Sequence, residues 1–364
     1  MENNTGIFIV EPKLGDFQVG AETGISKVLE PTGQYDKYLP TDETQSRNVF
    51  DCYGCVSFSA GNIFEILFEI LMQRGEIPAE HIAFLKENGY FDENGKINVS
   101  DRQIAKLSGT TQNGNGLPTV ADSVRHNGLV PEKKWPWPSE MKDTMTRDEK
   151  WAIYYKEVPQ EVIDLGKKFA EKFDILYQWV LVGTYSTNLL RKALAYGPVQ
   201  IAAAVCTPWS ATENDPPIKG CGCGAQHATV VYGYTENYDW KDYDTYKSFR
   251  KLLAPNYCIP YAFQYQISAK IPPVVVPFSY VFKVNLKSGA EATAEVKALQ
   301  RALQTLTRAD KTPYMRPGVF GPYGPQTQTA VRKFQSDHGI MDDGSNFGPK
   351  TRTAMNAELL KIKK

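Results

Sequence analysis

The sequence predicts an α+β domain followed by a small all-helical domain. Apolar residues recur at helical spacing through much of residues 55–195, and β-rich apolar runs begin only after residue 196. This segregation of helices from strands is typical of the α+β class. From residue 295 onward, a turn of Gly-Pro followed by a helix occurs twice, which indicates a separate helical module.

Length and composition narrow the classes of function. The chain has 364 residues, enough for two or three domains, and is 42% hydrophobic and 23% charged. Lys+Arg and Asp+Glu both number 41, so we expect neither nucleic acid nor an anionic membrane as a partner. No apolar run reaches the ~20 residues that cross a bilayer, and no basic-then-apolar leader opens the sequence. We therefore expect no signal peptide and no membrane insertion.

A cysteine-containing stretch marks the start of the first long helix. Residues 1–44 are an irregular lead-in that could lie across the main domain. The stretch Cys52-Tyr-Gly-Cys-Val-Ser-Phe-Ser-Ala60 follows, and an apolar run continues to Met72. Cys55 thus stands at a helix N-terminus, where partial positive charge favours a thiolate. A buried structural cysteine and a Cys-x-x-Cys redox or metal pair are the alternatives, the latter completed for zinc by Cys221-x-Cys223.

Further helices precede the strands. The loop at residues 110–116 is rich in Asn and Gly, and Trp135-Pro-Trp-Pro138 is expected on a surface ridge or groove wall. The predicted helices cover residues 55–72, 76–88, 102–107, 117–126 and 146–195.

The strands place two more polar side chains together. The runs 199–205, 226–234 and 239–246 are predicted strands, and the last two are joined by a short polar turn that indicates a hairpin. His227 begins one arm, and Asp244 lies on the other, where the hairpin brings it beside His227. A thiol that attacks a carbonyl needs a base, and the base needs a group that orients its ring. Cys55, His227 and Asp244 can supply these three roles.

The motifs around these residues resemble those of the papain-like cysteine peptidases. In that family the nucleophile lies in Cys-Gly-Ser-Cys-Trp-Ala-Phe-Ser-Ala, close to the stretch at Cys55. Its Gly-Pro-Val strand resembles Gly197-Pro-Val199, and its His-Ala strand resembles the run from Gln226-His-Ala-Thr229 to Tyr232-Gly-Tyr234. The likeness spans residues 45–260 and implies a papain-like fold with helical and antiparallel β subdomains. It also implies a disulfide at Cys52, whose partner the sequence does not identify.

Two departures from the family pattern leave alternatives open. The Asn that orients the histidine in the family is replaced by Asp244, with Tyr246 in place of the shielding Trp, and Asp242 is the rival on the same strand face. The family's oxyanion-hole Gln stands six residues before the nucleophile, where this chain has Val49. We expect Gln45 to take that role through a longer loop, with Asn48 as the alternative amide.

The end of the chain resembles the peptidoglycan-binding type 1 module. That family's pattern is similar to Val296-Lys-Ala-Leu-Gln-Arg-Ala-Leu303, to the run from Gln326 to Gln335, and to Asp343-Gly344 with Gly348-Pro-Lys-Thr351. The resemblance implies a three-helix domain. A helical module for protein docking is the alternative. The predicted organisation is therefore a lead-in at 1–44, a peptidase domain at 45–270, a proline-rich linker at 271–294 and a wall-binding domain at 295–364.

Together these features predict a cysteine peptidase or amidase that cleaves peptide bonds of bacterial cell-wall peptidoglycan. A bacteriophage lysin or a virion-associated enzyme would gain from such a tether, which raises local concentration at the wall. Virion proteins are then possible partners, and the virion or the host cytoplasm is the expected location before the enzyme reaches the wall. The alternatives are a protein-processing cysteine protease and a catalytically inactive structural or binding protein. The proposed chemistry requires no metal and no cofactor.

Overall fold

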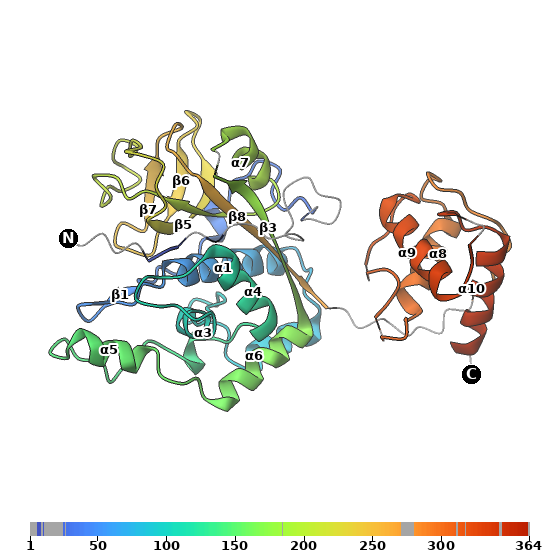
Figure 1. Ribbon diagram of the computed structural model, residues 1–364, viewed down its shortest axis with the longest axis horizontal. Coiled ribbons are helices and arrows are strands. Elements are labelled where there is room, and N and C mark those ends of the chain that lie inside the picture. The colour runs from blue at the N-terminus through green and yellow to red at the C-terminus, as the bar shows by residue number, and fades with distance from the viewer. Residues whose placement is uncertain are drawn as a thin grey trace. The chain divides into compact units, whose positions relative to one another are not determined.

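The structure, a computed structural model, describes residues 6–8, 10, 25, 27–183, 185–270, 280–310, 312–316, 318–341 and 344–362. The chain divides into two compact units, residues 1–270 and 271–364, and each is described by itself (Figure 1). Residues 271–279 of the predicted linker, much of the lead-in and Asp343 lie outside the described residues.

The first unit is built around helix α1 (Cys55–Gln73). Nearly all of its side chains are buried, because α1 lies between the sheet and the other helices (Figure 1). By length and composition α1 could cross a membrane, but 89% of its most apolar window is buried, as expected of a core helix. The other helices of this part are α2 (Ala79–Glu87), α3 (Asp101–Leu107), α4 (Leu117–Asn127), α5 (Arg147–Tyr154) and α6 (Gln160–Lys172), with 3-10 turns at Asp36–Tyr38 and Glu132–Lys134.

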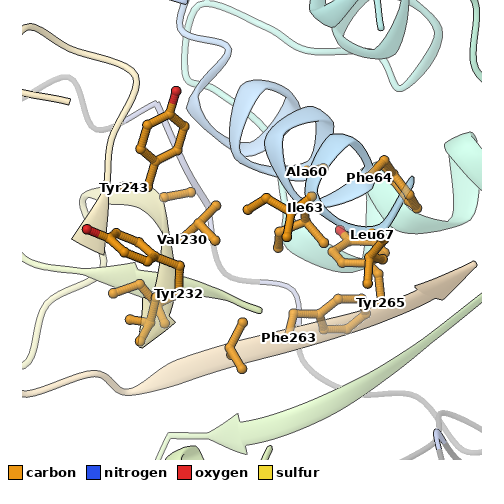
Figure 2. Close-up of a cluster of buried hydrophobic side chains, with 14 of the residues drawn as sticks. Ala60, Ile63, Phe64, Leu67, Val230, Tyr232, Tyr243, Phe263 and Tyr265 are labelled. Carbon is orange, nitrogen blue, oxygen red and sulfur yellow. The ribbon is translucent and has the colours of Figure 1, made fainter. Parts of the chain in front are cut away.

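A six-stranded antiparallel sheet covers the other side of α1. Its order is β3-β8-β4-β5-β6-β7. Figure 2 shows Ile63 and Leu67 of α1 packed near Val230 and Phe263 of the sheet. The strands are β3 (Phe173–Val182), β4 (Val199–Ala203), β5 (His227–Tyr234), β6 (Trp240–Tyr243), β7 (Arg250–Leu253) and β8 (Tyr261–Ala269); α7 (Thr187–Leu194) joins β3 to β4, and a small hairpin pairs β1 (Ser46–Arg47) with β2 (Phe50–Asp51).

The prediction of continuous helix over residues 146–195 is wrong in its middle. Residues 173–182 form β3, which pairs with β8 along almost its whole length, with an irregularity between Trp179 and Leu181. The segment is rich in aromatic and β-branched residues, which suit a half-buried pleated surface. Strands β7 and β8 were not predicted either. The partner strand β8 lies about 90 residues downstream, so local spacing could not show the pairing.

The aromatic cluster near residue 136 is packed rather than displayed. Trp135 is only 5% exposed, and the guanidinium of Arg102 lies 4.3 Å from its ring centroid. Trp137 packs against Phe50 and Tyr154. The surface-ridge prediction is therefore wrong for Trp135, since burying so large a ring stabilises the fold more than displaying it.

The second unit is a three-helix domain made of α8 (Ala294–Thr305), α9 (Pro325–Asp337) and α10 (Pro349–Ile362). Its repeat is visible in buried hydrogen bonds. Gln300 of α8 donates to Thr327 of α9 (3.0 Å), and Gln335 of α9 donates to Thr351 of α10 (2.9 Å). Each amide thus joins one helix to the first turn of the next.

The predicted fold class is confirmed for both units. The first has a helical part and an antiparallel β part on either side of a helix that begins at a cysteine, and the second is a small helical domain.

Candidate active site

Cys55 is the first residue of α1, and Gly54 is the N-cap. The helix start places partial positive charge beside this residue. A side chain at Gly54 would bring its Cβ to 3.0 Å from the Cys52 sulfur and 3.2 Å from the Phe58 ring. Glycine is therefore the residue that lets the turn before Cys55 pack this tightly.

His227 and Asp244 come from the neighbouring arms of the β5–β6 hairpin. His227 begins β5, and Asp244 directly follows β6. The His227 Nε2 and Asp244 Oδ1 atoms are 2.6 Å apart, and the Cys55 side chain lies close enough to the imidazole to raise its pKa. Helix α1 packs against β5, so three distant segments meet at one point. The structure thus brings together Cys55, His227 and Asp244, the three residues to which the sequence analysis assigns the roles of nucleophile, base and orienting group.

Asp244 is surrounded by donors. Oδ1 accepts hydrogen bonds from His227 and from the backbone N–H groups of Thr245 (2.6 Å) and Tyr246 (3.4 Å). Oδ2 accepts from the Trp209 indole (2.8 Å) and from the Lys251 ammonium (2.6 Å). Only a carboxylate can accept on both oxygens at once.

These contacts set the charge of the site. Burial opposes ionisation of Asp244, but the adjacent His227 and Lys251 outweigh it and lower the pKa of the carboxyl. Burial likewise opposes a charge on His227, but the Asp244 carboxylate and the Cys55 sulfur raise the pKa of the imidazole to about 10. At neutral pH the histidine is therefore an imidazolium, the partner a thiolate requires.

Asp242, the rival orienting group, is directed elsewhere. Its Oδ1 accepts a hydrogen bond from Thr229 (2.6 Å), and its Oδ2 has no hydrogen-bond partner among the residues that the structure describes. Burial and the nearby charge of Asp244 raise the pKa of Asp242 to about 7. Asp244, rather than Asp242, is the carboxylate in contact with His227.

Gln45 lies beside the strand end that carries Asp244 rather than in a recorded contact with Cys55. Its side-chain nitrogen donates to Asp51 (3.0 Å) and to the Tyr246 hydroxyl (2.9 Å), while its oxygen accepts from Thr245 (2.7 Å). Both amide hydrogens are therefore engaged. An oxyanion would have to replace one of these acceptors.

Asn48, the other candidate amide, lies in the turn between β1 and β2. Its side-chain oxygen accepts from the Trp137 indole (3.2 Å), and the residue is exposed. Among the described residues, Asn48 makes hydrogen bonds with Trp137 and Lys150 but not with Cys55 or His227. Of the two amides, Gln45 is the one held near the trio.

Aromatic rings flank the imidazole. The Tyr246 ring lies 5.1 Å from the His227 ring, in the place expected of a shield, and Trp209 lies 5.8 Å away. The sequence did not single out Trp209 or Lys251. Trp209 belongs to the loop 207–224, and Lys251 sits on an unpredicted strand, so neither had a local signal.

Residues 6–8, here called the strap, lie across Cys55. The Cys55 sulfhydryl donates to the Gly6 carbonyl (3.2 Å), and Ile7 pairs in parallel with Asn115. Gly114 permits this approach, because a Cβ there would fall 1.8 Å from the Gly6 carbonyl carbon. Under the strap Cys55 has no exposed surface.

The remaining cysteines exclude the four-sulfur zinc alternative. Disulfides join Cys206 to Cys221 and Cys223 to Cys258. Cys221 and Cys223 are therefore unavailable as thiolate ligands. Cys52 is a free, buried thiol, so the disulfide that the family resemblance implied there is not formed. Burial raises the pKa of Cys52, which leaves it a poor nucleophile.

Comparisons with known proteins bear on both units. Residues 292–355 match the family model described as a putative peptidoglycan binding domain, in the region where the motifs indicated one. Among curated proteins, no sequence matches the chain.

Several solved structures are similar to the chain. Bromelain from Ananas comosus, crystallised with the E64 inhibitor, is 13% identical over 65% of this chain and 95% of its own, with a TM-score of 0.40. Xylellain, a cysteine protease from Xylella fastidiosa, is 16% identical over 73% and 96%, with a TM-score of 0.48. Digestive procathepsin L2 from Tenebrio molitor larval midgut is 13% identical over 73% and 78%, with a TM-score of 0.43. At these values the likeness adds nothing to the geometry of the site.

Proposed function

We propose that the first unit is a cysteine peptidase or amidase and that the second unit holds it on bacterial peptidoglycan. The observation that carries the proposal is the meeting of Cys55, His227 and Asp244, with 2.6 Å between the imidazole and the carboxylate. A thiol at a helix start beside a carboxylate-oriented imidazole is suited to acyl transfer.

The proposed reaction begins with the Cys55 thiolate. Its sulfur attacks the carbonyl carbon of the scissile amide, and the carbonyl electrons move to the oxygen. The His227 imidazolium then gives its proton to the leaving amine, the C–N bond breaks, and a thioester remains on Cys55. With the thiolate consumed, His227 takes a proton from water, and the resulting hydroxide hydrolyses the thioester. Asp244 keeps the ring oriented throughout.

The developing oxyanion needs donors. The backbone N–H of Cys55, in the first turn of α1, can donate a hydrogen bond to the oxyanion. In this proposal Gln45 adds a second donor by releasing the Tyr246 hydroxyl or Asp51. Substrate entry also requires the strap to leave Cys55, because the Gly6 carbonyl occupies the hydrogen-bonding position at the sulfur.

Peptidoglycan stem peptides are the proposed substrate. The match of residues 292–355 to a wall-binding family model supports this choice, since a tether raises the local concentration of the hydrolase at the polymer. Two disulfides in the first unit fit work in an oxidising environment outside the cytoplasm. A phage lysin or virion-associated wall enzyme, delivered to the wall from a virion or a lysing host, is the role that combines these features.

A protein-cleaving peptidase is the second candidate. The observation that favours it is the strap itself, an extended polypeptide paired with Asn115 over the nucleophile. Zymography separates the two candidates. Clearing of gels that contain cell walls, absent in Cys55→Ser, supports wall hydrolysis, whereas clearing of casein alone supports the second candidate. If neither substrate is cleared and Cys55 shows only the reactivity of a free thiol, the catalytic proposal fails.

A further inference from the structure

Lys251 is an ammonium with no access to solvent. It belongs to β7, directly opposite Asp242 of β6, and its side chain is 0% exposed. Its nitrogen donates to Asp244 Oδ2 (2.6 Å) and to the Trp209 carbonyl (2.9 Å), and it lies 4.4 Å from the Trp209 ring centroid. Lysines are almost never fully buried unless they are paired. The pairing with Asp244 therefore bears on the charge of the site.

The net charge of the groups in the proposed reaction shows how Lys251 affects the site. A Cys55 thiolate and a His227 imidazolium are together neutral. The Asp244 carboxylate adds one negative charge at a position with no exposed surface. In such a low-dielectric place an uncompensated charge strongly shifts the protonation of its neighbours. The Lys251 ammonium restores neutrality at a distance of 2.6 Å.

We infer that Lys251 is a positioning residue that balances the charge of Asp244, so that a carboxylate can orient His227 without disturbing the thiolate–imidazolium pair. This inference rests on the proposed function. Lys251 acts through Asp244.

The surroundings explain why a carboxylate stands here rather than a neutral amide. An asparagine would orient the imidazole without adding charge. At position 244, however, its NH₂ group would face the indole N–H of Trp209 and the ammonium of Lys251, which are both donors. Lys251 and Trp209 therefore belong with an aspartate, and a neutral version of the site requires all three positions to change.

Other charged groups face Lys251. Besides Asp244 these are Asp242, on the opposite strand, and His227 with Cys55 beyond the carboxylate. Asp242 titrates near neutral pH, since its pKa is raised to about 7. Asp242 is kept in all the variants of Lys251, Asp244 and Trp209 described below. A separate Asp242→Asn variant measures how much Asp242 itself contributes to the pH profile.

The test is the pH profile of Cys55 alkylation by iodoacetamide in two backgrounds. The profile has a lower limb, where Cys55 loses its proton, and an upper limb, where His227 loses its proton. With Asp244 present, Lys251→Met removes a positive charge, so both limbs move to higher pH by about one unit. In the Trp209→Phe/Asp244→Asn background, Lys251 is an unbalanced positive charge that holds both limbs at lower pH. There, Lys251→Met moves the profile back to within a few tenths of a unit of wild type. One substitution thus disturbs the first background and repairs the second.

Matched controls separate this role from a merely structural one. Lys241→Met removes another lysine of the same sheet, which pairs with Asp36 at 2.7 Å, and leaves the profile unchanged. Trp209→Phe alone reports the cost of losing the indole N–H. A variant that loses only Asp244 or only Lys251 can fail to fold. In that case the supporting result is that Trp209→Phe/Asp244→Asn/Lys251→Met, which loses both charges, folds and has the wild-type profile.

Two results would overturn the inference. One is an unchanged profile in folded Lys251→Met protein. The other is a further loss, instead of a repair, when Lys251→Met is added to the Trp209→Phe/Asp244→Asn background. Cys55→Ser and His227→Ala are run beside these variants. If His227→Ala leaves alkylation of Cys55 unaltered, the proposed function itself fails, and that outcome is distinct from a failure of Lys251 alone.

Discussion

Asp244 and Asp242 stand two residues apart and are both fully buried, but the pKa values of their carboxyl groups are shifted in opposite directions. Five donors surround Asp244, and the pKa of its carboxyl is lowered despite burial. Asp242 accepts one hydrogen bond from Thr229, and its pKa is raised to about 7 by burial and by the charge of Asp244. Burial alone therefore does not decide whether an acid is charged; the donors around each oxygen do.

A second contrast lies on the helical side of the first unit. Glu65 and Asp101 are buried there near Glu43 and Glu132, and among the described residues no lysine is paired with either of them as Lys251 is with Asp244. Arg47, which pairs with Glu43 at 3.4 Å, only partly offsets the negative charge. Burial, and then repulsion from Glu43, raises the pKa of Glu65, Asp101 and Glu132, that of Glu132 to about 8. The sheet side thus lowers the pKa of its key acid, Asp244, whereas the helical side raises the pKa of Glu65, Asp101 and Glu132.

The largest expected effect comes from Asp244→Ala. This change leaves the Lys251 ammonium buried without its partner and the imidazole without its orienting group. We expect hydrolysis to fall by about 10³-fold and the free energy of unfolding by about 3–5 kcal/mol. Steady-state kinetics and urea unfolding measure the two effects. Activity within about threefold of wild type in a folded variant would remove Asp244 from the proposed mechanism.

Glu132→Gln probes the helical side through the sign of its pH dependence. The raised pKa means that Glu132 binds its proton more tightly in the folded than in the unfolded chain. Its contribution to stability is therefore fully present below about pH 4.5 and is lost as the pH rises through 8. Gln keeps an acceptor for the Trp137 N–H (3.0 Å).

The unfolding free energy of Glu132→Gln, relative to wild type, should therefore increase by about 1 kcal/mol per pH unit between pH 5 and 8. Urea unfolding at a series of pH values checks this slope. For Asp244 the sign is the opposite: its lowered pKa gives stability that is present above about pH 4 and is lost as the pH falls. A flat difference for Glu132→Gln would contradict the contrast.

Removal of residues 1–10 tests the strap. Gly6 contacts Cys55 but neither aspartate, so the change alters access to the sulfur without altering the charges behind it. We expect the alkylation rate at pH 7 to rise roughly tenfold or more, since a buried group reacts only from its open state. Because Cys55 donates to the Gly6 carbonyl only as a thiol, loss of the strap should also move the midpoint of Cys55 ionisation to lower pH. An unchanged rate would show that the strap does not limit access.

Asp242→Asn should have the smallest effect. Asn can still accept the Thr229 hydrogen bond, and Asp242 does not touch His227. Hydrolysis should stay within about threefold of wild type. Stability relative to wild type should rise as the pH approaches 7, because burial no longer opposes an ionisation there. A loss as large as that of Asp244→Ala would reverse the assignment of the orienting group.

The sequence predicted those parts of the site that local patterns encode. Cys55 stands at a helix start with a run of apolar residues after it, and His227 and Asp244 occupy opposite arms of one hairpin. Lys251 escaped prediction because a lysine in an alternating strand normally faces solvent. Only the register of β6 against β7 places Lys251 opposite Asp242 and within 2.6 Å of Asp244. Contacts that depend on register and tertiary packing are not readable from spacing.

The same limit explains the other differences. The role of Gln45 depends on how the β1–β2 hairpin, inserted between it and Cys55, folds back. The strand at 173–182 depends on a partner far along the chain. The three helices of the second unit were predicted well because their apolar spacing, and the Gly-Pro turns before α9 and α10, are local features of the sequence.

The pH dependence of Cys55 alkylation, in the full chain and in the variant without residues 1–10, tests the central claim most directly. We expect rapid labelling well below pH ~8.5, where a free thiol is half ionised, and loss of that reactivity in both Cys55→Ser and His227→Ala. Cys52 remains in every protein as a buried internal reference. If Cys55 without the strap labels only as a free thiol does, or if His227→Ala leaves the profile in place, the thiolate–imidazolium pair does not exist and the catalytic account is wrong.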